Sequence, residues 1–147
     1  KTLSKLVFNK GNLGDNRFLI KNNNQKNSEF EKVKSDKLDN FTSKLNKKNT
    51  LIFMDVQGHE PYVLKGGTKT IKKQIPIVLE FSPYLLDKNW IANFDLLFKN
   101  YKYFYNLHNN KRKKLNKENF NELFKEIKSK KIINPDLSSY ATDLMIV

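Results

Sequence analysis

The sequence contains no cysteine. This absence excludes disulfide bonds, thiolate zinc sites and cysteine nucleophiles. It also contains no run of about 18 apolar residues, so no segment is predicted to span a bilayer. Because neither feature points to an oxidising compartment or a membrane, the cytoplasm is the expected location.

Several sequence motifs that are typical of particular enzyme classes are missing as well. There is no Gly-x-x-x-x-Gly-Lys-Ser/Thr loop, no Gly-x-Gly-x-x-Gly fingerprint and no Gly-x-Ser-x-Gly elbow. The only two histidines, His59 and His108, are far apart in sequence and make no persuasive metal site. These absences argue against P-loop NTPases, dinucleotide-binding dehydrogenases, serine hydrolases of that type and zinc enzymes.

The composition is that of one folded domain. The chain has 147 residues, of which 38% are hydrophobic and 12% aromatic, so it can bury a core despite its charge. The formal net charge of +13 raises the possibility of a nucleic-acid partner. Lysines spread along the chain carry almost all of it, however, and arginine occurs only at positions 17 and 112. The composition therefore favours a solvated basic surface, with a basic nucleic-acid-binding α/β module or a non-catalytic remnant as alternatives.

Strand and helix patterns alternate along the chain. Residues 51–54 and 75–79 are continuous apolar runs, which are typical of strands buried on both faces of a parallel sheet. Further strands are predicted at 6–8, 18–20, 30–34, 101–107 and 143–147, and helices at 38–45, 61–65, 68–74, 90–98 and 118–128. The basic cluster at 111–114 is interpreted as a loop. The order of elements predicts an α/β fold.

Two of the apolar runs end in an acid, Asp55 and Glu80. The carboxyl ends of parallel strands form the ligand-binding edge of such sheets. In the turn after Asp55, Gly58 would allow the backbone to approach a ligand closely, and His59 and Glu60 offer titratable groups. Each has a simpler interpretation: Asp55 as a turn residue, His59 as a surface histidine, Glu60 as a helix cap and Glu80 as a partner of a lysine.

The stretch from 51 to 67, LIFMDVQGHEPYVLKGG, resembles the signature of FkbM-type methyltransferases. In that family an apolar strand leads into Asp-Val-Glu/Gln-Gly-x-Glu, followed by a helix with Val-Leu-x-Gly. The flanking stretches NLGDN (12–16), KLDNF (37–41) and PIVLEF (76–81) resemble the family's Asn-x-Gly loop, Leu-Asp-x-Phe segment and next strand.

The resemblance implies the C-terminal part of a class I, Rossmann-like methyltransferase sheet with helices on both faces. It implies S-adenosylmethionine as cofactor and a hydroxylated small molecule or glycan as acceptor. By resemblance, Asp55, Val56 and Gln57 lie beside the methionine part of the cofactor, with Gly58 close by. Asp55 is then the side chain expected to be indispensable, while His59, Glu60 and Glu80 are candidates for acceptor binding or proton removal.

The family's Gly-rich cofactor loop and its ribose-binding acid are absent from this sequence. Two strand–helix crossovers of about 30 residues each would be needed to supply them. We therefore expect residues 1–147 to form a single partial methyltransferase domain of a larger enzyme. The strand before Asp55 is then expected to have an open edge.

Overall fold

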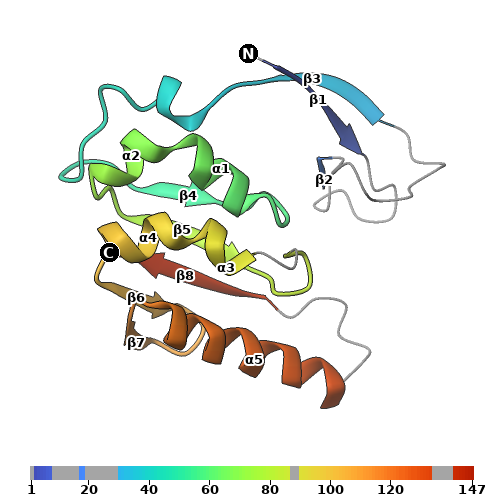
Figure 1. Ribbon diagram of the computed structural model, residues 1–147, viewed down its shortest axis with the longest axis vertical. Helices are drawn as coiled ribbons and strands as arrows, with labels where there is room; N and C mark the ends of the chain where they lie inside the picture. The colour runs from blue at the N-terminus through green and yellow to red at the C-terminus, as the bar shows by residue number, and fades with distance from the viewer. Residues whose placement is uncertain (1, 8–16, 19–29, 87–89, 134–140) are drawn as a thin grey trace.

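The computed structural model describes residues 2–7, 17–18, 30–86, 90–133 and 141–147 of the chain (Figure 1). Its strands are β1 (Thr2–Val7), β2 (Arg17–Phe18), β3 (Phe30–Ser35), β4 (Ile52–Met54), β5 (Ile77–Phe81), β6 (Tyr103–Asn106), β7 (Lys111–Lys114) and β8 (Thr142–Ile146). Its helices are η1 (Leu38–Asn40), α1 (Glu60–Gly66), α2 (Thr68–Lys72), α3 (Trp90–Asn93), α4 (Asp95–Asn100) and α5 (Lys117–Ile133). Strands and helices alternate from β4 onward, so the predicted α/β class is confirmed.

The strands form two sheets. The smaller sheet has the order β2-β1-β3 and is antiparallel, and Figure 1 shows it to one side of the larger one. The larger sheet has the order β4-β5-β8-β6-β7. In it β4 and β5 are parallel, whereas β8 lies antiparallel between β5 and β6. Strands β4, β5 and β6 therefore all point the same way, and their carboxyl ends share one edge.

One face of the larger sheet carries the core. Alternate residues on its strands, among them Met54, Leu79, Leu144 and Phe104, belong to one buried cluster with the apolar sides of the helices. At its centre Phe120 of α5 contacts the rings of Phe81, Trp90, Phe94, Phe98 and Phe104. The helices touch one another as α1 with α3, α2 with α4 and α3 with α5, which makes them a single layer (Figure 1).

The opposite face of the larger sheet is less covered. On it, Phe53 of β4 is 71% exposed, whereas the neighbouring Val78 of β5 is buried. The sequence predicted that both apolar runs are buried on both faces. This prediction is confirmed for β5, and it is wrong for β4. The reason is position: β4 is the edge strand, as expected, and no described helix covers Phe53. Helices on this second face stay a prediction.

The helix predicted over 38–45 is wrong in length, because only η1 forms there. The carbonyl oxygens of Thr42, Ser43 and Leu45 accept hydrogen bonds from the Lys73 ammonium, at 2.7, 2.8 and 3.1 Å. A distant side chain thus satisfies backbone groups that a helix would have satisfied locally.

The loop predicted at 111–114 is also wrong, because these residues form β7. Strand β7 pairs antiparallel with β6 across a turn over 107–110, in which Asn110 takes a left-handed φ of 55°. Asparagine tolerates that conformation, which closes the hairpin. The four consecutive cations of 111–114 show no alternation of apolar and polar residues, so the sequence did not predict a strand. These residues form a strand because their backbone pairs with the aromatic-rich β6.

The remaining predictions differ in detail. The helix over 90–98 is divided into α3 and α4 at Phe94, and α5 extends beyond both ends of the predicted 118–128. The loop over 9–16 and most of the strand over 18–20 lie outside the described residues. Within the described part of the chain, no helix is long and apolar enough to cross a membrane.

Candidate active site

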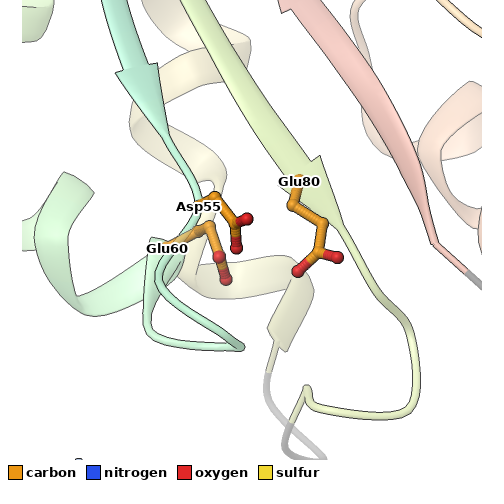
Figure 2. Close-up of side chains that lie close together, drawn as sticks. All are labelled: Asp55, Glu60 and Glu80. Atoms are coloured by element: carbon orange, nitrogen blue, oxygen red, sulfur yellow. The ribbon is translucent and has the colours of Figure 1, made fainter. Parts of the chain in front are cut away.

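The candidate site lies where β4 and β5 end. Because β4 and β5 are parallel and Met54 pairs with Leu79, the next residues, Asp55 and Glu80, stand at the same level of the sheet. Glu60, the first residue of α1, comes back to the same point after a short turn. Figure 2 shows the three side chains converging on one region at this edge.

The three carboxylates are close enough to act together. One oxygen from each of Asp55, Glu60 and Glu80 lies within 4.8 Å of the others. Their environments differ, since Asp55 is exposed, Glu80 is half-buried and Glu60 is only 2% exposed. Carboxylate oxygens are ligands that divalent cations such as Mg²⁺ and Ca²⁺ prefer, and they also attract other cations. The arrangement concentrates negative charge at the expected ligand-binding edge.

Glu60 has a carboxylate whose pKa is shifted by its surroundings. Burial raises its pKa, and the nearby charge of Asp55 adds to this effect. Hydrogen bonds from backbone N–H groups oppose the rise, among them that of Val56, whose nitrogen is 3.0 Å from Oε1. The Glu60 side chain therefore accepts a hydrogen bond from within the β4–α1 turn, as expected from the simpler interpretation of it as a capping residue. It is also one of the three carboxylates of the acidic cluster.

The turn before Glu60 has an unusual backbone. Gln57 and Gly58 both have left-handed φ angles, 52° and 89°. The side-chain amide of Gln57 donates a hydrogen bond of 2.8 Å to Asp55 Oδ1. A Cβ placed on Gly58 would lie only 2.6 Å from the Cβ of Leu85. The glycine thus lets this turn pack against the loop after β5, and so fixes the two acidic strand ends relative to each other.

His59 borders the cluster without belonging to the group of three. It is half-buried, and burial lowers the pKa of its imidazole, so the ring is neutral at pH 7. Its ring centroid is 5.4 Å from that of Tyr62 on α1. The other histidine, His108, lies in the exposed turn between β6 and β7.

Comparison with known protein families shows which family the chain belongs to. The family model described as the methyltransferase FkbM domain matches residues 6–131. The chain belongs to the FkbM methyltransferase family. No curated protein and no solved structure gives a significant match.

The FkbM match covers every element that builds the acidic cluster. It also covers β7, although not β8, which inserts between β5 and β6. Two positioning residues of this FkbM domain gave no signal in the sequence. Leu85 is an ordinary apolar residue until its contact with Gly58 is seen, and Tyr62 is an ordinary helix residue until its ring meets His59.

A cavity of about 440 Å³ is lined by Tyr62 and seven other residues. Residues of the segment joining β3 to η1 and of α1 line it: Ser35, Asp36, Lys37, Leu38, Phe41, Tyr62, Val63 and Gly66. Its volume is in the range of small-molecule sites. None of the three acids lines it, and Tyr62 on its wall is the ring neighbour of His59.

Proposed function

We propose that this FkbM chain takes part in methyl transfer from S-adenosylmethionine to a hydroxyl oxygen of a sugar or another small hydroxylated acceptor in the cytoplasm. The observation that carries the proposal is the convergence of Asp55, Glu60 and Glu80 at the carboxyl edge of β4 and β5. In open α/β sheets this edge is where ligands bind.

The charge of the site fits the donor. S-adenosylmethionine supplies an electrophilic methyl group on a positively charged sulfur. Carboxylates favour a cation bound beside them, and the effect is largest where water is partly excluded, as at Glu60 and Glu80. Asp55 is exposed and therefore reachable by a ligand, and Gln57 holds one of its oxygens. We assign Asp55, Val56, Gln57 and Gly58 to the donor side of the site.

The acceptor side needs a group that takes the hydroxyl proton. As the bond between acceptor oxygen and methyl carbon forms, the carbon–sulfur bond breaks and the proton passes to a base. Burial raises the pKa of Glu60, which brings its basicity closer to neutral pH than that of an ordinary carboxylate. We assign this role to Glu60 or Glu80, with neutral His59 as the alternative base. Such a base contributes roughly 10²–10⁴-fold.

Positioning contributes more than the base. Holding acceptor oxygen, methyl carbon and sulfur in line is worth about 7–11 kcal/mol in favourable cases. The cavity of about 440 Å³ that Tyr62 lines is large enough for a small acceptor, and the Tyr62 ring is also the neighbour of His59, the alternative base. Asp36 and Lys37 on its wall would meet hydroxyl groups.

Calorimetric titration of S-adenosylhomocysteine tests the donor assignment. The titration compares the 147-residue chain with any longer natural form, because the family resemblance implies a Gly-rich cofactor loop and a ribose-binding acid that residues 1–147 do not contain. Binding by the longer form, weakened by Asp55→Asn, is the expected result. Absence of binding by both forms would contradict the proposal.

A further inference from the structure

Strands β6 and β7 present basic and aromatic side chains together on the sheet face away from the helices. Directly paired residues point to the same side, so the pairs Tyr105–Arg112 and Tyr103–Lys114 share one face. The intervening Phe104 is buried against Phe120 on the other face, which fixes the direction. We call Tyr103, Tyr105, Arg112 and Lys114 the β6–β7 surface.

This surface is accessible. Arg112 and Lys114 are exposed, Tyr103 is 39% exposed and Tyr105 is partly exposed. The Arg112 guanidinium carbon lies 4.7 Å from the centroid of the Tyr103 ring. The described helices all pack on the opposite face and leave this one open.

The cations on the two faces of the β6–β7 hairpin differ in whether they have an acidic partner. On the helix side, Lys113 pairs with Glu122 of α5 at 2.9 Å, and nearby Lys117 pairs with Asp95 at the same distance. On the open face, Arg112 and Lys114 have no acidic partner among the described residues. Two acids on that face, Glu80 and Asp143, are cross-strand neighbours at the carboxyl end of β5, where the Asp143 carbonyl accepts a hydrogen bond from Leu107 N just after β6. The positive charge of the β6–β7 surface is therefore left for a partner.

Protection of a sheet edge explains only part of this pattern. Lysines on an edge strand prevent other chains from pairing with it. They do not require an exposed and a partly exposed tyrosine on the neighbouring strand, or an arginine held over one of the rings. Arg112 is also one of only two arginines in a chain whose other cations are lysines.

We propose that the β6–β7 surface binds single-stranded nucleic acid. Bases stack on exposed aromatic rings while adjacent cations contact the phosphates, a combination typical of proteins that bind single strands. In a duplex the bases are stacked and paired, so their ring faces cannot reach Tyr103 and Tyr105. This inference concerns a surface separate from the acidic cluster and does not depend on the proposed methyl transfer.

The test is fluorescence anisotropy of a labelled oligouridylate of about 12 nucleotides, a length within the usual site size. Binding to the full chain is measured between about 50 and 200 mM salt. The double variant Arg112→Gln/Lys114→Gln removes two cations from the surface. The matched control, Lys65→Gln/Lys72→Gln, removes two exposed lysines from α1 and α2.

The expected result is a loss of affinity in the surface variant that the control does not share. Each lost phosphate contact reduces the salt slope by about 0.7, so the double variant should lower it by roughly 1.4. Tyr103→Leu, which keeps the charge, should weaken binding roughly tenfold by removing one stacking platform. Circular dichroism confirms that the variants remain folded.

Four outcomes would overturn the assignment. Equal losses in the surface variant and the control would mean that binding follows net charge alone. Unchanged affinity in Tyr103→Leu, or equally tight binding to a duplex, would remove the single-stranded specificity. Equal, surface-dependent binding to vesicles of anionic phospholipid would assign the surface to membranes instead.

Discussion

The side-chain amide of Gln57 donates a hydrogen bond of 2.8 Å to Oδ1 of Asp55 from a left-handed backbone position. The two residues are separated only by Val56, yet the contact requires the chain to reverse between them. It fixes the direction of a carboxylate that is otherwise exposed. Asp55 is thus the one acid of the cluster that is both reachable and oriented.

Gln57→Asn tests this orientation. Asparagine tolerates the left-handed backbone and keeps the amide, but it is one methylene shorter and does not reach Asp55. A hydrogen bond to a charged group is worth about 1.5–3 kcal/mol. We expect methyl transfer to fall roughly tenfold or more, and the free energy of unfolding to fall by at most that amount because the hydrogen bond is exposed. Equal activity in a methyl-transfer assay would show that this hydrogen bond does not position Asp55 for function.

Asp55→Asn should abolish turnover while the fold survives. The change is isosteric and at an exposed position, so packing is preserved and only the charge is lost. We expect at least a hundredfold loss of methyl transfer, comparable with removing one preorganised electrostatic group. Glu122→Gln, the same chemical change on an exposed position of α5, is the control and should leave activity intact. Normal turnover in Asp55→Asn would remove Asp55 from the mechanism.

Gly58→Ala should destabilise the protein more than Gly67→Ala. At Gly58 the new Cβ would lie 2.6 Å from Leu85 Cβ and 3.0 Å from Leu85 O, and the φ of 89° is unfavourable for alanine. At Gly67 the nearest atom is Cδ2 of Leu38, the mobile end of a side chain. We expect Gly58→Ala to lower the free energy of unfolding by about 2–4 kcal/mol and Gly67→Ala by about 1 kcal/mol.

Urea unfolding measures both glycine variants. Adding Leu85→Gly to Gly58→Ala removes the clashing Cβ and should recover part of the loss. No coupling between the two changes would contradict the contact between these loops.

Glu60→Gln tests the buried carboxylate through pH. Because burial and the charge of Asp55 raise the pKa of Glu60 above 4.5, its folded form binds a proton more readily than its unfolded form. The stability that this group contributes is therefore fully present below pH 4.5 and is lost as pH rises through the raised pKa. Glu60→Gln has no such titration.

The stability of the wild type, relative to Glu60→Gln, should thus decrease as pH rises from 4 to 8, as followed by urea unfolding at each pH. Glu31→Gln, at an exposed position on β3, is the control and should run parallel to the wild type. A relative stability that is flat or rises with pH would contradict the raised pKa.

Asp39 caps a helix that begins 29 residues later in the chain. Its carboxylate accepts hydrogen bonds from the backbone nitrogens of Lys69 and Thr70, at 3.0 and 2.8 Å, and from the Thr70 hydroxyl. Burial alone would raise the pKa of Asp39, but these hydrogen bonds outweigh it and lower the pKa below 3.8. The cap's contribution is therefore present above pH 3.8 and is lost as pH falls through the lowered pKa.

Asp39→Ala should cost about 0.5–2 kcal/mol at pH 7, the usual effect of losing an N-cap. The difference from the wild type should shrink as the solution is acidified, and thermal unfolding at a series of pH values would show it. A difference that persists unchanged at pH 2 would mean that the charge of Asp39 plays no part.

Much of the candidate site could be predicted because it depends on strand ends. The apolar runs before Asp55 and Glu80 predicted two parallel strands, and parallel strands bring their carboxyl ends to one edge. The glycines and proline between them predicted the turn and the helix start. Local chemistry was sufficient because each of these features depends on residues close together in the chain.

Where the prediction failed, contacts between distant residues had replaced local preferences. The segment over 38–45 is not a helix because Lys73 takes up its carbonyl groups, and β7 is a strand because β6 pairs with it. A pattern of four cations carries no information about that pairing.

The sequence by itself determined the family, through the motif resemblance of residues 51–67, and it determined the α/β class and the strand-end positions of Asp55 and Glu80, which follow from hydrophobic runs and short spacings. Only the tertiary structure decided how the acids differ: which is buried, which is exposed, and that Gly58 is needed because Leu85 stands against it. It also decided which cations of β7 find an acid and which face solvent. Burial and pairing depend on residues far away in the chain, and no local pattern records them.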